Sequence, residues 1–273
     1  MPVFARFILG FILSLAIAAV AVRRGSLSRS GGAAAVLIGT GIYAGGGGAW
    51  FFALVTFFVS STLLGRVGRA RKATIKREFE KGDTRDAKQA LANGGIALLC
   101  SLAMLVSGNL AWSGAFVGAL STANADTWAT ELGVLSRGEP LSLTRFKHVP
   151  RGTSGAISAL GLVATAGGAL AIGLVAAAAH QAFMLSSARL LILALAAGVV
   201  GSLTDSLLGA TLQGGYHCAA CDRSCEGGVH HCGHRTRHVR GLRWLDNDCV
   251  NLAATLMGAA VGALIAVSGE PRQ

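Results

Sequence analysis

The stretch AAAVLIGTGIYAGGGGAWFFALVTFFVSSTLL at residues 33–64 decides the class of fold, because it carries no charged side chain over its whole length. A bilayer core of about 30 Å is crossed by roughly 20 helical residues, so this stretch is too long for one crossing. Four successive glycines at 45–48 interrupt it, and glycine favours the backbone conformations of a tight turn. We therefore expect a hairpin of two transmembrane helices.

The same character extends outward along the chain, which is 52% hydrophobic and only 14% charged over 273 residues. Further apolar runs cover residues 3–22, 90–107, 111–135, 154–180, 188–212 and 250–267. Solid apolar runs favour helices, because an open sheet leaves backbone groups unpaired in lipid and a barrel shows alternation. We predict an all-α polytopic transmembrane bundle of about eight helices, forming a single membrane domain over residues 1–273.

Basic residues indicate the topology. All but three of the 24 Lys and Arg residues lie at 23–30, 65–89, 136–152 and 213–247. With eight helices these segments share one side, which the positive-inside rule makes cytoplasmic, with both termini outside. We expect the inner (cytoplasmic) membrane as the location; the alternative for the first run is a signal peptide. The basic face suits anionic substrates or membrane lipids, and its spread over short loops argues against nucleic acid as a partner.

Acidic residues inside the apolar runs, or just before one, are costly in lipid and usually functional. They are Asp126 and Glu131 in STANADTWATELG (121–133), Asp205 in GSLTDSLLGATLQ (201–213) and Asp248 in LDNDCVNL (245–252). Amide side chains at the same level are Asn93, Asn124, Asn247 and Asn251. At about 1.5 Å of rise per residue all of them fall in the cytoplasmic half, which predicts one pocket open to the cytoplasm. The alternative is that they only hold helices together.

The carboxylates have no basic partner in the same helices, so they would repel one another unless a cation lies among them. Mg²⁺ is the simplest choice, since it takes carboxylate and phosphate oxygens, and it points to a nucleotide phosphate. After Arg151, the residues Gly152, Thr153 and Ser154 are expected at a helix N-terminus, which favours a phosphate group. Ser and Thr at that place are also ordinary helix caps.

A Cys/His-rich cytoplasmic loop is expected at residues 213–247, with the string YHCAACDRSCEGGVHHCGHRTRHVRGLRW at 216–244. Disulfides are disfavoured in the cytoplasm, so Cys218 and Cys221, followed by His231 and Cys232, favour a structural Zn²⁺ site. The spacing does not choose among His230, His231 and His234, and Cys225 is a rival ligand. Unligated thiols or a redox pair are the alternative. Zinc would fold a loop too short to bury a core.

Four strings, ADTWATELG, RGTSGAIS, DSLLGATLQ and WLDNDCVNL, occur in this order. Together with the Cys/His loop they resemble the membrane protein family that includes plant phytyl-phosphate kinase and many uncharacterised bacterial and archaeal relatives. More distantly, the layout is similar to the polyprenol and phytol kinases that use CTP. The resemblance spans residues 93–251.

The resemblance implies a phosphotransferase, an isoprenyl-phosphate kinase that moves the γ-phosphate of a nucleotide, CTP by preference, to phytyl phosphate or a similar prenyl monophosphate. It also implies roles for the polar residues. Mg²⁺ and nucleotide are assigned to Asp126, Glu131, Asp205, Asn247, Asp248 and Asn251, and the phosphates to Gly152, Thr153 and Ser154. The alternative is a membrane carrier of an anionic metabolite or lipid, although we find no internal repeat with polar residues on both faces.

Overall fold

The structure is a computed structural model that describes residues 1–68, 72, 84–151, 153–225, 227–230 and 232–268. Its helices are α1 Val3–Arg23, α2 Arg29–Arg66, α4 Ala87–Ser107, α5 Leu110–Gly133, α6 Ala159–Ala178, α7 His180–Phe183, α8 Ser187–Thr211 and α9 Asn247–Val267. Its strands are β1 Leu141–Ser142, β2 Ala156–Ile157, β3 Gly215–Cys218, β4 Arg223–Cys225 and β5 Arg237–Arg240.

Helix α2 is the predicted hairpin. Its helical geometry breaks at Gly47, where φ is +74° and ψ is −162°, a conformation that favours glycine. The rings of Tyr43 and Phe51 are 5.6 Å apart, whereas eight residues of straight helix would separate them by about 12 Å. The two legs of α2 therefore run side by side in opposite directions. The first leg begins at Arg29, so it is longer than the apolar run alone suggested.

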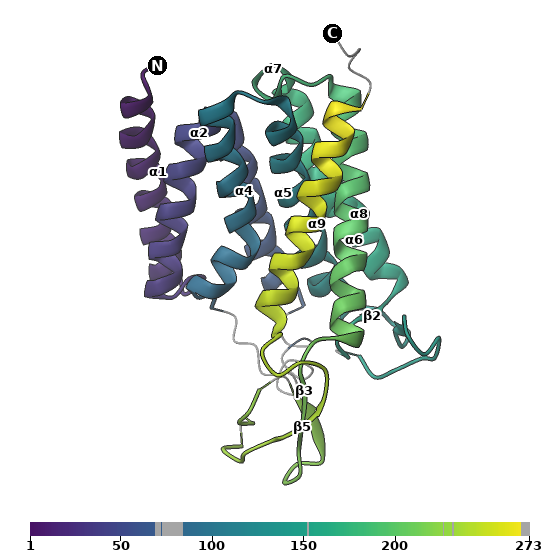
Figure 1. The fold of residues 1–273 in the computed structure, drawn as a ribbon. Helices are drawn as coiled ribbons and strands as arrows, with labels where there is room; N and C mark the ends of the chain where they lie inside the picture. Colours follow the sequence, from purple (N-terminus) through teal and green to yellow (C-terminus); the bar gives the residue numbers. More distant parts are fainter. Residues whose placement is uncertain (69–71, 73–83, 152, 226, 231, 269–273) are drawn as a thin grey trace.

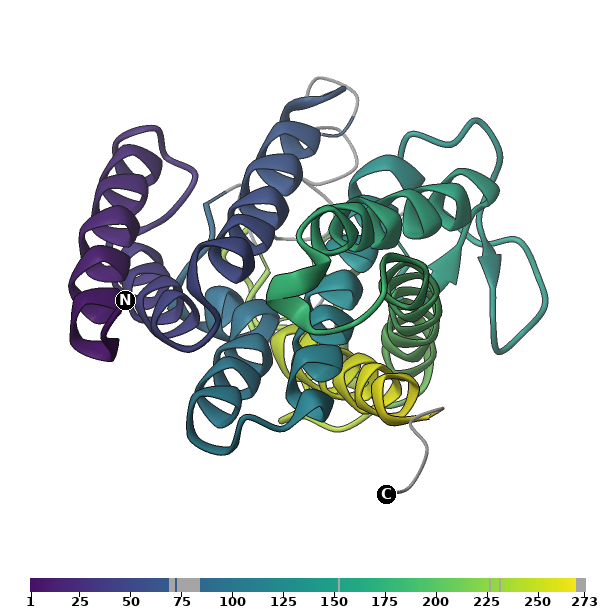
Figure 2. The ribbon, with the colours of Figure 1, turned by 90° about the horizontal axis from the view of Figure 1, so that it is seen from above.

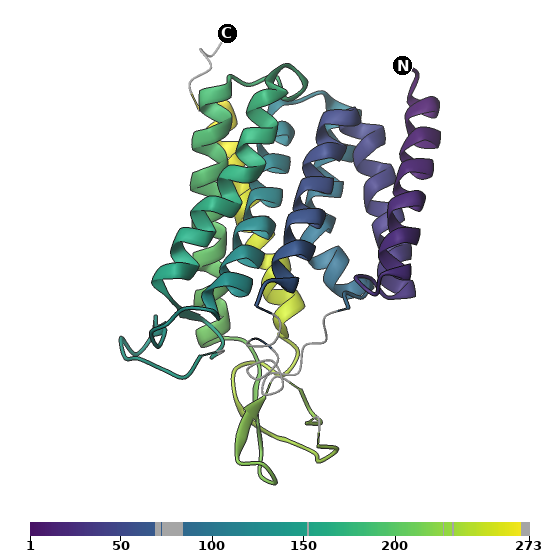
Figure 3. The same ribbon diagram turned by 180° about the vertical axis from the view of Figure 1, so that it is seen from behind.

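The long connections all lie at one end of the bundle. The N-terminus and the last turn of α9 lie at the opposite end, near the turn of α2 and the short helix α7, whereas strands β3 and β5 project from the other end (Figures 1 and 3). The sequence prediction that the basic segments share one side is confirmed for the described residues. We call this side the loop end.

Among the described residues, six helices are long and apolar enough to cross a membrane: α1, α2, α4, α6, α8 and α9. With α2 folded into two legs and α5 in the centre, the all-α polytopic bundle predicted from the sequence is confirmed. Helix α1 stands at the outer edge and packs against α2 (Figure 2).

Helix α5 is the centre of the bundle, because it contacts α2, α4, α6, α8 and α9. Every residue from Ser113 to Ala125 is buried. The closest approach is to α9, where a Cβ atom on Gly118 would collide with the carbonyl oxygen of Gly258. Small residues allow this approach between helices in lipid, where van der Waals packing replaces the hydrophobic effect as the driving force.

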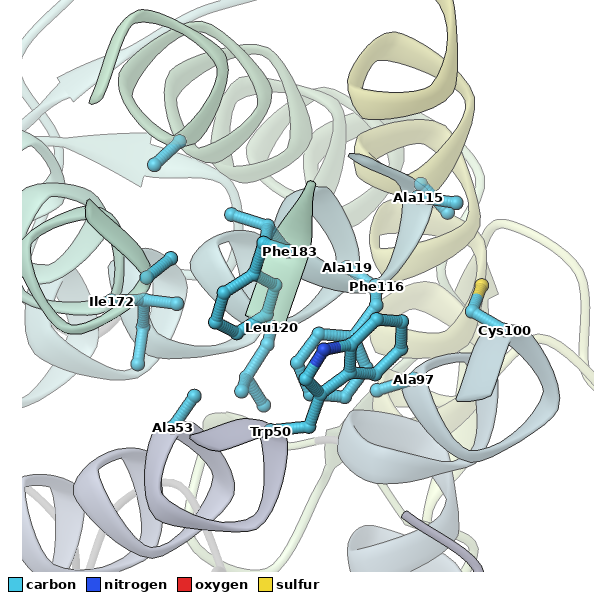
Figure 4. Packing of buried hydrophobic residues seen from close by; sticks show 14 of the residues in the cluster. Trp50, Ala53, Ala97, Cys100, Ala115, Phe116, Ala119, Leu120, Ile172 and Phe183 are labelled. Carbon is cyan, nitrogen blue, oxygen red and sulfur yellow. The ribbon is translucent and has the colours of Figure 1, made fainter. Parts of the chain in front are cut away.

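An aromatic cluster lies where the turn of α2 meets α7, opposite the loop end. Figure 4 shows its members Trp50, Phe116 and Phe183 packed together. Trp50 lies against Phe116, with ring centroids 4.3 Å apart, and stacks on Phe183 at 5.4 Å. The indole nitrogen of Trp50 donates a hydrogen bond to the carbonyl oxygen of Ala182 at 3.1 Å. This contact joins the turn of α2 to α7. The cavities lined by acidic residues open at the other end of the bundle, the loop end.

The start of the sixth helical segment differs from the prediction. Helix α6 begins at Ala159 with Ser158 as its N-cap, so Thr153 and Ser154 precede the helix and do not form its N-terminus. Gly155 is the reason, because its φ of +74° interrupts the helix and its Cα packs against the backbone of Ser206 in α8. The predicted placement of these residues at a helix N-terminus is therefore wrong, and Gly152 lies outside the described residues.

We expect Gly118→Val to separate α5 from α9 and to destabilise the protein by about 1–3 kcal/mol, because overpacking a tight contact forces backbone shifts. Thermal unfolding in detergent measures this change. Gly95→Val is the matched control, because nothing lies within 4 Å of the Cβ position at Gly95. Equal melting temperatures for the two variants would contradict the packing described here.

Candidate functional site

The larger of two cavities at the loop end has a volume of about 440 Å³. Its polar lining includes most of the intramembrane polar residues predicted from the sequence. They are Asn93 on α4, Asp126 and Glu131 on α5, Asp205 on α8, and Asn247 and Asn251 on α9. These residues come together because each lies in the part of its helix nearest the loop end. Residues 247 and 251 are one turn apart, which places both amides on one face of α9.

A second cavity of about 260 Å³ adjoins the first on the side of α6 and α8. It is lined by Arg151, Thr153 and Ser154 from the connection before α6. Both cavities share lining residues, namely Asp126, Thr130, Glu131, Asp205 and Asn247. The carboxylates therefore stand at the junction between two spaces.

The turn before α6 is held on α8 by side-chain hydrogen bonds. The Ser154 hydroxyl lies 3.1 Å from Oε1 of Gln213 and 3.2 Å from the carbonyl oxygen of Gly209, and it donates to these oxygens. Thr153 donates its hydroxyl hydrogen to the carbonyl oxygen of Pro150. Although this turn is not a helix N-terminus, it still brings the predicted Thr and Ser to the rim of the second cavity.

A buried ion pair that the sequence did not reveal lies beside the carboxylates. Lys72, whose side chain is 1% exposed, donates to Oε2 of Glu131 at 2.6 Å and to the carbonyl oxygen of Leu64 at 2.7 Å. Glu131 therefore has a basic partner, supplied by the connection after α2 and not by a transmembrane helix. Lys72 is one of nine basic residues in segment 65–89, and nothing in the sequence distinguishes it.

Arg85 is a second cation near Glu131. Its backbone pairs with the α1–α2 connection, because Ser28 N–H donates to the Arg85 carbonyl oxygen at 2.9 Å. Its guanidinium carbon lies 5.9 Å from the centre of the Phe57 ring. Burial lowers the pKa of Arg85, and the negative charge of Glu131 opposes that shift. Together with Arg24 and Arg66, Arg85 makes the mouth of the larger cavity basic.

Two predicted residues have surroundings unlike the rest. Asn124 is fully buried and is absent from the lining of both cavities. Its amide nitrogen donates to the Gly168 carbonyl oxygen at 2.7 Å, and its oxygen accepts from the Ser60 hydroxyl at 3.0 Å. Asn124 thus links α2, α5 and α6. Asp248 is half-buried in the first turn of α9 and also lines neither cavity.

The neighbour of Asp248 has a structural role. Asp246 is the N-cap of α9 and accepts hydrogen bonds from the backbone N–H groups of residues 248 and 249. It also forms an ion pair with Lys88 at the start of α4. Burial raises the pKa of Asp246, but the hydrogen bonds from Lys88 and the backbone hold it below its usual range. This pair joins α4 to α9 at the mouth of the site.

The predicted Cys/His loop folds into the three-stranded sheet β4–β3–β5. Cys218, Cys221, His230 and Cys232 place one donor atom each within 4.8 Å of one another. Three of these are the predicted residues. His231 lies outside the described residues, and Cys225 is not in the group.

The chemistry of this group suits a metal ion. The hydrogen bond between His230 Nδ1 and Cys232 Sγ, at 3.0 Å, lowers the pKa of the Cys232 thiol to about 5. Metals bind the thiolate form of cysteine, so a lowered pKa favours binding. In the part of the chain that the structure describes, the three carboxylates at the cavity junction form no comparably tight group. They surround a space instead.

Comparisons with known proteins place the chain in a family. It matches the family described as "Integral membrane protein DUF92" over residues 12–259. It is 32% identical to Protein PGR of Arabidopsis thaliana over 96% of both chains. It is 31% identical to an uncharacterized membrane protein of Methanocaldococcus jannaschii, over 78% of this chain and 74% of that one.

A further relative is Protein VTE6, chloroplastic, of Arabidopsis thaliana, which is 27% identical over 88% of this chain and 65% of that protein. No solved structure shows a significant match. The matched residues include both cavities, the acidic motifs and the Cys/His loop. This chain belongs to the DUF92 family of integral membrane proteins.

Proposed function

We propose that this protein is an isoprenyl-phosphate kinase that transfers the γ-phosphate of a nucleoside triphosphate, CTP by preference, to a prenyl monophosphate. The observation that carries the proposal is the junction of two cavities at Asp126, Glu131 and Asp205. A phosphotransferase must hold two anionic substrates with their reacting phosphates side by side. The resemblance of the motifs to the family that includes plant phytyl-phosphate kinase supports the same reaction.

The smaller cavity suits the nucleotide. Arg151, Thr153 and Ser154 offer it a cation and two hydroxyl groups, and the shared carboxylates and Asn247 stand at its inner end. These oxygen donors are the kind that Mg²⁺ prefers, and bound Mg²⁺ would neutralise the phosphate oxygens of the nucleotide. Asp126 and Asp205 are the residues we assign to that ion, with Glu131 held in place by Lys72.

The reaction needs little from the protein beyond position and charge. A phosphate oxygen of the acceptor forms a bond to the γ-phosphorus, and the bond from that phosphorus to the β,γ-bridging oxygen breaks. The nucleoside diphosphate leaves with the electron pair. A phosphate monoester is largely dianionic at neutral pH, because its second pKa is about 6, so the acceptor needs no general base. Arg85 and Arg66 balance the charge at the basic mouth.

Orientation follows from charge. Because the basic segments share the loop end, we assign that end to the cytoplasm, where the nucleotide is available. The Cys/His group lies at the same end. We propose that its members Cys218, Cys221, His230 and Cys232 bind a structural Zn²⁺. The zinc would stabilise a segment whose short strands bury little apolar surface.

The direct test of the function uses purified protein with Mg²⁺, a panel of prenyl monophosphates and each nucleoside triphosphate, scored for prenyl diphosphate. We expect diphosphate with at least one acceptor and the highest rate with CTP. Absence of diphosphate with every pair, combined with transport of a labelled anion or lipid into proteoliposomes, would instead establish a carrier.

Asp126→Asn and Asp205→Asn should each lower turnover roughly a hundredfold, the effect of losing about 3 kcal/mol of transition-state stabilisation. Each substitution keeps the size of the side chain and removes a charge from the cavity junction. Asp248→Asn should cost less, because Asp248 lines neither cavity. Turnover at saturating Mg²⁺ measures the effect.

Asp222→Asn is the control for these variants, because Asp222 is 96% exposed in the Cys/His loop and lines neither cavity. Melting temperatures should stay close to that of the wild type for all four variants. Wild-type turnover in both Asp126→Asn and Asp205→Asn would remove these carboxylates from the active site.

Cys218→Ser and Cys232→Ser should each abolish stoichiometric zinc and lower the melting temperature, because the free energy of binding is also folding energy for so small a segment. Metal analysis of purified protein measures the zinc. Cys225→Ser is the matched control and should keep it, because Cys225 lies outside the group of four. The reverse pattern, with zinc lost only from Cys225→Ser, would refute the assignment.

A further inference from the structure

The larger cavity has an apolar part that the chemistry of phosphate transfer does not use. Its walls come from α1 and both legs of α2, and include Ile17, Ala18, Ile38, Leu54, Val55 and Phe58. We call this part the apolar groove. None of its wall residues carries a charge, whereas the acidic residues of the cavity come from α5 and α8.

The apolar groove runs deep into the bundle. Along the second leg of α2 the lining extends from Arg66 to Phe51, which is about 22 Å at 1.5 Å per residue. At the far end Ser14, Gly39 and Phe51 meet, because a Cβ atom on Gly39 would collide with the Ser14 hydroxyl and lie 3.1 Å from the Phe51 ring. Ser14 and Phe51 are buried, so the groove ends there.

The positive charge at the mouth of the larger cavity indicates which kind of ligand binds there. Arg24, Arg66 and Arg85 line the mouth, next to the junction of carboxylates. A ligand that satisfies the whole cavity therefore has an anionic head and a long apolar tail. A soluble anion would leave the apolar walls without a partner, and a neutral lipid would offer no negative charge to the arginines at the mouth.

We propose that the apolar groove between α1 and the two legs of α2 binds the isoprenoid chain of the acceptor, and that its depth sets the chain length the enzyme prefers. This inference rests on the proposed kinase function and names the part of the site that recognises the lipid. Ala35 and Val55 are the specificity-determining positions, because both line the groove, are half-buried and face it from different legs of α2.

The experiment fills the groove and compares a long acceptor with a short one. In Ala35→Trp, we expect the KM for geranylgeranyl monophosphate to rise at least about tenfold, the effect of excluding roughly two methylene groups from an apolar site. The KM for dimethylallyl monophosphate, whose shorter chain buries much less apolar surface in the groove, should change by less than about twofold.

Matched controls lie on the same legs. Ala33 is exposed and does not line the cavity, so Ala33→Trp should leave both acceptors unchanged. If Ala35→Trp does not fold, Val55→Trp repeats the test from the opposite wall, with the exposed Val59→Trp as its control. Equal effects on long and short acceptors, or no effect on either, would overturn the proposal.

Binding without nucleotide separates this proposal from the kinase reaction. Titration calorimetry in detergent should show that the wild type binds geranylgeranyl monophosphate more tightly than dimethylallyl monophosphate, and that Ala35→Trp loses the difference. Such binding without any phosphate transfer would refute the proposed kinase function but support lipid binding in the apolar groove. Phosphate transfer with equal affinity for both lipids would refute chain recognition by the apolar groove but support the proposed kinase function.

Discussion

The structure depends on one constraint, which is that carboxylates inside a lipid-embedded bundle must be compensated by cations. Glu131 meets it through Lys72, and Arg85 adds a second positive charge close by. Both cations come from connections at the loop end, so the acidic residues must stay within reach of that end. The opposite end, closed by Trp50 and its aromatic neighbours, carries none of this polar chemistry among the described residues.

That constraint also explains why the bundle is asymmetric about α5. On one side, α6 and α8 bring a polar turn with Ser154 to the carboxylates. On the other side, α1 and the hairpin α2 add apolar walls that lead to the same carboxylates. Helix α5 packs closely on α9 at Gly118, and this packing fixes the position of Asp126 and Glu131 between the two cavities. In the proposed reaction, the water-soluble and lipid-soluble substrates meet at that boundary.

The helix bundle, the hairpin of α2 and the shared side of the basic segments could be predicted from the sequence. Each depends on a local feature: the length of an apolar run, the glycines at the α2 turn or the basic residues of a loop. The start of α6 could not be predicted in this way, because Gly155 interrupts the apolar run through its packing on α8. Lys72 was missed because its pairing with Glu131 spans distant segments. Asn124 resembles the cavity residues in sequence, and only its hydrogen bonds between helices reveal another role. Sequence spacing likewise did not single out His230 among the histidines of the Cys/His loop, because its closeness to the cysteines arises only when the loop folds.

The central claim is that the two cavities hold two substrates at once on either side of shared carboxylates. Equilibrium binding of a non-hydrolysable CTP analogue with Mg²⁺, measured with and without a saturating prenyl monophosphate, tests it most directly. The account predicts a ternary complex, in which the affinity for the analogue is unchanged or higher when the lipid is bound. Competition, in which saturating lipid displaces the analogue, would contradict it.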